Sequence, residues 1–133
     1  MLLVDTNVLV DVLQDDPKWA DWSIAQMRAQ AALHALVINP VIYAEMSLSF
    51  STLEALDDVV HTLGLELREI PRPALFLAAK AYAQYRRLGG NKQQVLPDFF
   101  IGAHAAVEGW PLLTRDASRF KTYFPTLRVL APA

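Results

Sequence analysis

The chain has 133 residues, of which 53% are hydrophobic and 20% are charged, and its formal net charge is −2. This composition predicts one folded domain over residues 1–133 with a real hydrophobic core, and it argues against disorder. The sequence contains no cysteine, which excludes disulfides, thiolate metal sites and cysteine nucleophiles.

Short apolar runs alternate with helical patterns along the chain. Strands are predicted at 2–4, 36–38, 65–70, 112–114 and 127–130, with 65–70 near an edge because its apolar and polar residues alternate. Helix starts are read from capping residues and from prolines, and helix ends from glycines. The predicted helices are 7–13 capped by Thr6, 17–33 with Pro17 in its first turn, one from Pro40, one from a capping box at 51–54 to Gly64, and then 74–88, 97–109 and 117–123.

The order of strands and helices indicates parallel β-α-β units with right-handed crossovers. The predicted fold is therefore α/β, a three-layer α/β/α sandwich around a central, mostly parallel sheet. In such sheets, ligands bind beyond the carboxyl ends of the strands. We therefore expect any functional site to lie at that edge.

Four acidic residues border apolar segments. Asp5 directly follows the strand 2–4, and Asp116 follows the strand 112–114. Glu45 lies in the helix that starts at Pro40, and Asp98 lies in the first turn of the helix 97–109. Carboxylates are seldom buried unless they are paired or bound to a cation. The pattern indicates one cluster around a hard metal ion, which prefers oxygen ligands.

Each acid alone has a simpler structural explanation. Asp5 would serve as a helix cap, and Asp98 and Asp116 suit the dipole of a helix's first turn. Glu45 would be a buried acid paired with an arginine. One shared metal site explains all four residues more economically than four separate reasons.

Other residues have two interpretations. The basic groups around Arg86 and Arg115 are either contacts to an anionic partner or ordinary solvated faces. Trp19 and Trp22 are spaced to pack into the core or to anchor a partner. His104 is the one histidine near the predicted crevice, and no second histidine is spaced to share a metal with it.

Four segments in order resemble a known family. VDTNVLVDVL, the glutamate of VIYAEM, PDFFIGAHA and LLTRDASRF together resemble a PIN domain, and more closely the VapC-type ribonuclease toxins of prokaryotic toxin–antitoxin pairs. The resemblance covers nearly the whole chain. It implies Mg²⁺- or Mn²⁺-dependent hydrolysis of RNA phosphodiesters, because such a cation activates water and neutralises phosphate charge.

The resemblance also implies roles for individual residues. The catalytic set is Asp5, Glu45, Asp98 and Asp116; Asp5 and Asp98 hold the ion, Asp116 binds it through water or holds a second ion, and Glu45 orients or deprotonates the attacking water. Hydroxyls of Thr6 and Thr114 and the amide of Asn7 keep these groups in place. RNA contacts are expected from Arg115, Arg86 and Arg87.

The resemblance further implies a homodimer and a cognate protein antitoxin whose tail fills the groove beside the carboxylates. The alanines and two tyrosines of the helix 74–88 are a candidate dimer face. No apolar run approaches the ~20 residues that span a bilayer, and the start of the chain lacks signal-peptide features. A cytoplasmic protein without membrane contact is therefore expected.

Two other functions compete with the nuclease. An aspartate-based phosphatase is disfavoured, because such domains usually carry a second Asp near the first and a lysine on a later strand, whereas Asn7 is the polar residue two positions after Asp5. A non-catalytic PIN-like module that binds RNA or protein is disfavoured by the intact acidic quartet, since an unused cluster of like charges would only destabilise the fold.

Overall fold

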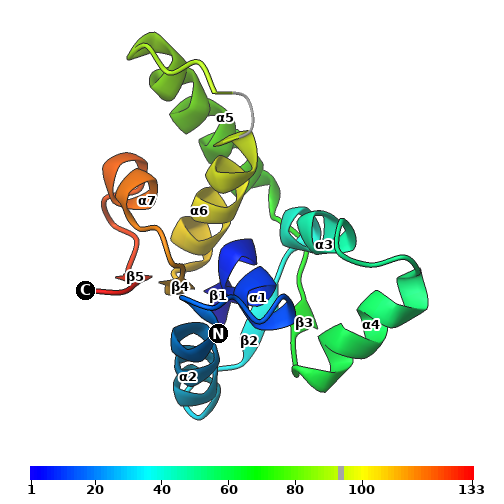
Figure 1. Ribbon diagram of the computed structural model, residues 1–133. Helices are drawn as coiled ribbons and strands as arrows, with labels where there is room; N and C mark the ends of the chain where they lie inside the picture. Colours follow the sequence, from blue (N-terminus) through cyan, green and yellow to red (C-terminus); the bar gives the residue numbers. More distant parts are fainter. Residues whose placement is uncertain (93–94) are drawn as a thin grey trace.

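The computed structural model describes residues 1–92 and 95–133. The strands within these residues form one sheet in the order β3-β2-β1-β4-β5, and every neighbouring pair is parallel. The strands are β1 Leu2–Val4, β2 Leu36–Ile38, β3 Glu66–Leu67, β4 Leu112–Leu113 and β5 Val129–Leu130. The helices are α1 Thr6–Leu13, α2 Ala20–Ala31, α3 Pro40–Ser47, α4 Leu53–Thr62, α5 Arg72–Arg87, α6 Leu96–Glu108 and α7 Ser118–Tyr123. The predicted α/β sandwich is confirmed (Figure 1).

The strand order creates a crevice beside β1. From β1 the chain proceeds outward through β2 to β3, and it then returns to pair β4 with the other side of β1. Connections after β1 and β4 therefore leave in opposite directions, which opens a binding crevice at the carboxyl ends of these two strands. Val4 lies beside Leu113 in the register, and the Asp5 amide donates to the Leu113 carbonyl at 2.8 Å. The residues that follow β1 and β4 are thus immediate neighbours.

Several helix starts differ from the prediction by one to three residues. Asp5, rather than Thr6, caps α1, because its Oδ1 accepts the Thr6 amide at 2.7 Å. Thr52, rather than Ser51, caps α4 by accepting the Ala55 amide at 3.2 Å, so the predicted capping box is displaced by one residue. In each case the residue with an extended backbone just before the helix takes the capping role.

The second helix starts later than predicted. Pro17 lies in a turn, and α2 begins at Ala20. The reason is Asp16, whose Oδ1 accepts the amides of Lys18 and Trp19, both at 2.9 Å. These two hydrogen bonds hold residues 17–19 in a turn that a helix would have to break.

Helix α5 packs on α6 inside the molecule. Ala74, Ala78 and Ala81 of α5 are buried, and the rings of Tyr82 and Tyr85 lie 5.4 and 5.5 Å from that of Phe99 on α6. The alanine and tyrosine face that the sequence offered for a dimer is therefore used within the chain. Figure 1 shows these two helices extending together away from the sheet.

Helix α7 lies very close to α6 because of Gly102. A Cβ atom at this position would lie 2.5 Å from the ring of Phe124 and 3.0 Å from that of Phe120, both of which are buried. Only a residue without a side chain permits this approach. The contact brings α7 beside the helix that carries Asp98 (Figure 1).

No helix within the described residues is long and apolar enough to cross a membrane.

Candidate active site

The four predicted acids line one cavity of about 310 Å³ at the carboxyl edge of the sheet. The cavity also contains side chains of predicted helper residues and two apolar residues. Its lining consists of Asp5, Thr6, Asn7, Val10, Glu45, Asp98, Arg115, Asp116 and Phe120. The four acids, which are up to 111 positions apart in the sequence (Asp5 to Asp116), are thus brought together by strand ends and helix starts.

Asp5 is the most buried of the four acids, with 4% of its surface exposed. Its Oδ1 accepts the Thr6 amide, and its Oδ2 accepts the Thr114 hydroxyl at 2.7 Å. Burial raises the pKa of Asp5 to about 7 although both hydrogen bonds act in the opposite direction, and the nearby carboxylates of Asp98 and Glu45 raise it further. The cavity therefore holds a carboxyl group whose ionised form a bound cation would stabilise.

Thr6 connects Asp5 with Glu45. Its amide donates to Asp5, and its hydroxyl donates to Glu45 Oε1 at 2.6 Å. Glu45 lies on α3, which begins where Asn39 accepts the Ile42 amide at 2.9 Å and Pro40 occupies the first turn. One threonine at the start of α1 thus fixes the relative positions of two acids from different helices.

Asn7 and Thr114 hold the two strand ends together. Asn7 Oδ1 accepts the Arg115 amide at 3.2 Å, and Asn7 Nδ2 donates to Thr114 Oγ1 at 3.3 Å. Thr114, which is fully buried, also accepts the Asp116 amide at 3.2 Å. These contacts link the residues that follow β1 to those that follow β4, and the supporting roles that the sequence predicts for Asn7 and Thr114 stay a prediction.

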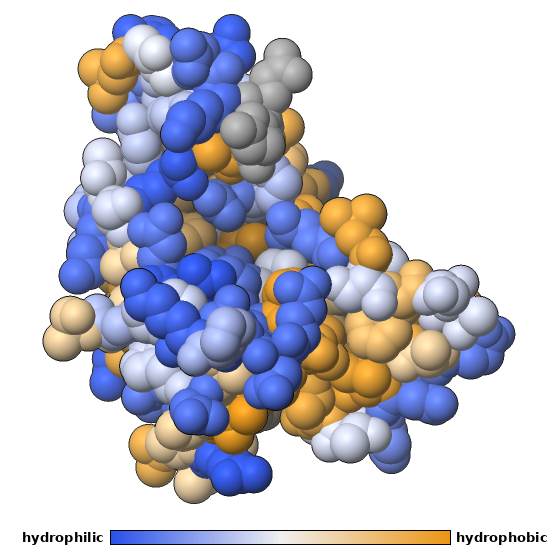
Figure 2. Space-filling view, viewed as in Figure 1, coloured by the Kyte–Doolittle hydropathy of each residue, from blue (hydrophilic) through white to orange (hydrophobic). Residues whose placement is uncertain are grey.

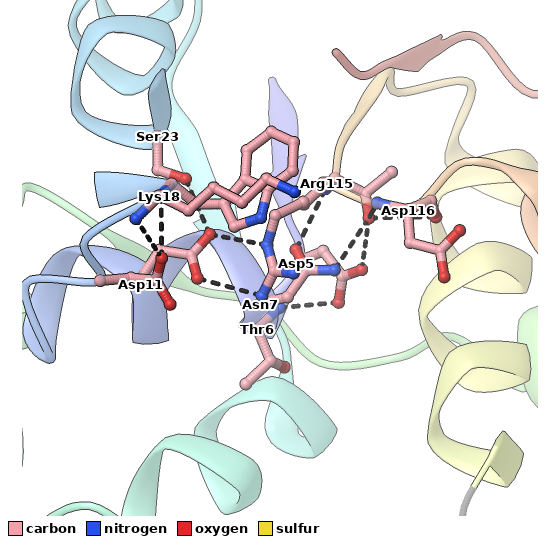
Figure 3. Close-up of polar contacts among 11 residues, drawn as sticks. Asp5, Thr6, Asn7, Asp11, Lys18, Ser23, Arg115 and Asp116 are labelled. Atoms are coloured by element: carbon pink, nitrogen blue, oxygen red, sulfur yellow. Dashed lines mark hydrogen bonds and ion pairs between the residues drawn. The ribbon is translucent and has the colours of Figure 1, made fainter. Parts of the chain in front are cut away.

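Asp98 and Asp116 have partners of their own. Asp98 Oδ2 accepts a hydrogen bond from Arg119 Nη1 at 2.6 Å, and burial raises the pKa of Asp98 although the Arg119 guanidinium lowers it. Asp116 Oδ1 accepts from the amide and hydroxyl of Ser118 at 3.4 and 3.3 Å, close to the start of α7. In Figure 3 the carboxylate of Asp116 points away from that of Asp5.

The side-chain oxygens of the cavity are ligands that a hard divalent cation prefers, but their present positions do not form a metal site. Within residues 1–92 and 95–133, no three acidic or histidine side chains are gathered closely enough to hold a metal as they stand. Nevertheless, the cavity supplies only oxygen ligands, which Mg²⁺ and Mn²⁺ prefer, and it concentrates negative charge around a buried acid. Asp5, Asp98 and Asp116 are the residues that would hold such an ion after their side chains reorient.

Arg115 forms an ion pair with a buried acid, which contradicts the interpretation of it as an ordinary solvated residue. Its Nε and Nη2 donate to Asp11 at 2.9 and 3.0 Å, and its guanidinium lies 5.5 Å from the centre of the Trp19 ring (Figure 3). Asp11 is 2% exposed and also accepts the Ser23 hydroxyl at 3.1 Å. The sequence analysis missed Asp11, although an acid in the apolar segment VDTNVLVDVL was the available signal.

Arg115→Met is expected to destabilise the protein by about 2 kcal/mol, because it leaves the buried Asp11 without its cation. This loss is below the roughly 3–5 kcal/mol of a wholly buried pair, since the Arg115 side chain is 33% exposed. Urea denaturation measures it, with Arg87→Met as the control for removing one exposed arginine. Equal stability of the two variants would show that the Asp11 pair contributes nothing.

Arg86 and Arg87 are not brought to the cavity. Both are exposed in the last turn of α5, and neither belongs to the lining of the acidic cavity. Figure 1 shows that this end of α5 projects away from the sheet. If these two arginines contact RNA as predicted, the contact would lie outside the acidic cavity.

His104 is a core residue of α6, the helix that carries Asp98, and it contacts the residue that caps α3, the helix that carries Glu45. It is fully buried, and its Nδ1 lies 3.2 Å from Asn39 Nδ2. Because Asn39 Oδ1 already accepts the Ile42 amide, its amide nitrogen is the donor to Nδ1, and Nε2 carries the proton. Nε2 has no hydrogen-bond partner among the described residues, and burial lowers the pKa of His104. His104 is thus a neutral structural link and not a metal ligand.

The fold and the cavity define a class of parallel α/β domains in which carboxylates gather in the crevice at the carboxyl ends of two neighbouring strands, here β1 and β4. The chain belongs to the PIN domain family, whose model matches residues 2–124. The match covers all four acids, and it confirms the resemblance that the sequence segments indicated. Comparison with curated proteins finds no matching relative.

Several solved structures that share this fold are VapBC or other toxin–antitoxin complexes. VapBC2 from Rickettsia felis, bound to a DNA fragment from its promoter, has a chain that is 17% identical, with a TM-score of 0.74 over 98% of this chain and 97% of that one. A chain of VapBC-1 from nontypeable Haemophilus influenzae is 16% identical, with a TM-score of 0.73 over 98% of this chain and 96% of that one. A chain of DNA-bound VapBC from Salmonella typhimurium is 20% identical, with a TM-score of 0.72 over 98% of this chain and 96% of that one. At these identities the likeness establishes the shared fold.

Proposed function

We propose that this protein is a Mg²⁺- or Mn²⁺-dependent endoribonuclease, the toxin of a type II toxin–antitoxin pair, which acts in the cytoplasm and is silenced by a protein antitoxin. The observation that carries the proposal is the convergence of Asp5, Glu45, Asp98 and Asp116 on one cavity of a PIN domain. The fold shared with the VapBC complexes supports the toxin role.

The cation, when bound, supplies charge neutralisation for the phosphodiester and activation of water. Asp5, Asp98 and Asp116 would hold it. Thr6 positions Asp5 and Glu45, and Asn7 and Thr114 keep the two strand ends together. We assign proton transfer to Glu45. Since Thr6 donates to Glu45 Oε1, Oε2 is the atom that accepts a proton from the attacking water.

Arg115 completes the site as a contact to the phosphate. Two of its nitrogens are held by Asp11, and Nη1 makes no hydrogen bond within the part of the chain that the structure describes. A guanidinium fixed in this way loses little side-chain entropy when it binds an anion. Nη1 is therefore the atom that we assign to the substrate.

A cleavage assay tests the proposed activity. Purified protein is incubated with total RNA in Mg²⁺ or Mn²⁺, and with EDTA in a matched reaction. We expect endonucleolytic products only with the divalent cation. Binding of RNA without cleavage in saturating Mn²⁺ would favour the non-catalytic module, and undiminished cleavage in EDTA would contradict a metal-dependent mechanism.

A hydrophobic groove between α2 and α4 is our candidate antitoxin surface. It is mostly apolar, has a volume of about 340 Å³, and is lined by Val12, Ile24, Met27, Arg28, Ala31, Leu36, Thr62 and Leu63. Figure 2 shows hydrophobic surface between the α1–α2 side of the molecule and α4. Grooves of this kind commonly accept the apolar face of an amphipathic helix. We propose that a helical segment of the antitoxin occupies it.

Ile24→Glu is expected to weaken antitoxin binding at least about 100-fold, because it places a charge in the apolar groove without a partner. Co-purification of the protein with the product of the adjoining reading frame measures the effect. Leu33→Glu is the matched control, since Leu33 is 75% exposed and lies outside the groove. Retention of the complex by both variants would place the antitoxin elsewhere.

We also propose a homodimer. Two large apolar side chains of α5 remain exposed beside its charged residues, Leu75 at 41% and Phe76 at 66%. Phe76→Glu is expected to convert a dimer to a monomer, as measured by light scattering coupled to size exclusion. A variant that keeps the mass of a dimer would exclude this face.

A further inference from the structure

The positively charged guanidinium of Arg119 is paired with Asp98, one of the four acids of the cavity. Arg119 Nη1 lies 2.6 Å from Asp98 Oδ2, and the two side chains are 26% and 31% exposed. Among the residues that the structure describes, this is the one salt bridge that involves any of the four acids. Arg119 is carried by α7, which Gly102 allows to approach α6 closely.

The position of Arg119 interferes with metal binding in two ways. A carboxylate oxygen that accepts a short, charge-assisted hydrogen bond is less available as a ligand. In addition, a guanidinium so close to Asp98 repels any divalent ion that approaches the same carboxylate, and this repulsion is weakly screened in a partly buried site. The absence of a ready metal-holding group among the described residues agrees with Asp98 being turned toward Arg119.

We propose that Arg119 is an internal competitor of the divalent cation for Asp98, so that the cation enters the site by displacing the guanidinium. The inference rests on the proposed function, because it presupposes a metal in this cavity. It assigns to Arg119 the task of setting metal affinity. The displaced guanidinium stays at the edge of the cavity.

Arg119 could instead help metal binding, and this role predicts the opposite change in metal affinity when Arg119 is removed. If Arg119 instead orients Asp98 for the metal, its removal lowers metal affinity by about 10- to 100-fold, as for other residues that position metal ligands. If Arg119 competes, its removal raises the affinity. The sign of the change therefore separates the two roles, whatever its size.

Calorimetric titration of Mn²⁺ into metal-free protein at physiological salt tests the proposal. Arg119→Met keeps the aliphatic part of the side chain and removes the charge, and we expect it to bind Mn²⁺ about 10-fold more tightly than wild type. Lys121→Met is the matched control. It removes an equal charge from the same helix at an exposed position, so it reports the general electrostatic effect, which we expect to stay within about two-fold at this ionic strength.

A thermal measurement gives a second readout without any RNA. Mn²⁺ is expected to raise the Tm of Arg119→Met by more than that of wild type, because the variant has lost the internal cation that the metal replaces. Arg119→Gln serves in the same way if the methionine variant does not fold.

The outcomes separate this inference from the proposed function. Equal or weaker Mn²⁺ binding by Arg119→Met, with wild type binding normally, would overturn the competition and leave the metal site intact. If neither wild type nor any Arg119 variant binds Mn²⁺, the proposed metal-dependent activity and the competition both fail.

Discussion

Asp5→Asn is expected to abolish metal-dependent RNA cleavage, with a rate loss on the order of 10³-fold or more, and to leave the fold intact. Asp5 is the most buried of the four acids that line the cavity, and it is one of the residues that we assign to hold the cation. Asparagine has nearly the same shape. Its Oδ1 still accepts the Thr6 amide, and its Nδ2 donates to the Thr114 hydroxyl in place of accepting from it.

The measurement is the rate of cleavage of a fixed RNA in saturating Mn²⁺, with both proteins purified identically from a host deficient in ribonucleases. Asp58→Asn is the matched control, because it removes an exposed carboxylate of α4 that is not part of the cavity. We expect the control to cleave at the wild-type rate. Full activity of Asp5→Asn would remove Asp5 from the mechanism and would invalidate the proposed site.

The same substitution is expected to stabilise the metal-free protein at neutral and alkaline pH. Burial raises the pKa of Asp5 from 3.8 to about 7 in the folded state. Between these values the folded protein keeps the Asp5 proton and the unfolded chain releases it, so raising the pH favours unfolding. The contribution of Asp5 to stability is thus complete below about pH 4 and is lost as the pH rises through about 7.

Urea denaturation in EDTA from pH 4 to pH 8 measures this effect. The free energy of unfolding of wild type should fall relative to that of Asp5→Asn across the range, by at most about 4 kcal/mol. Asp98 is present in both proteins, so the effect of its own raised pKa cancels except for the part that comes from its coupling to the Asp5 charge. Saturating Mn²⁺ should remove most of the relative fall, because a bound cation stabilises the charged form. Parallel pH curves for the two proteins would mean that Asp5 titrates normally.

The location of the site was predictable from sequence because it depends on backbone topology. In a parallel sheet, all strands end at one edge, so acids placed directly after β1 and β4 must meet there. Glu45 and Asp98 needed one further step, which is that a helix beginning near that edge directs its early turns toward the crevice. The four residue positions and the order of the elements contain all of this information.

The ion pairs were not predictable in the same way. Arg115 binds Asp11 across 104 positions, and Arg119 binds Asp98 across 21. The sequence has 12 lysine and arginine residues, and it does not show which of them lies beside which acid, because that depends on side-chain packing in the folded chain. Hydrophobic periodicity carries no information on this choice. Helix starts were misplaced for a related reason, since Asp16 and Thr52 formed local hydrogen bonds that competed with the neighbouring candidates.

The central claim is that acids from four separate segments share one divalent cation. A crystal grown with Mn²⁺ and measured for anomalous scattering tests it most directly. We predict an anomalous peak inside the cavity, within coordinating distance of Asp5 and of Asp98 or Asp116, and no such peak in crystals of Asp5→Asn. Mn²⁺ bound only outside the cavity, or a cavity without a peak at saturating Mn²⁺, would contradict the claim.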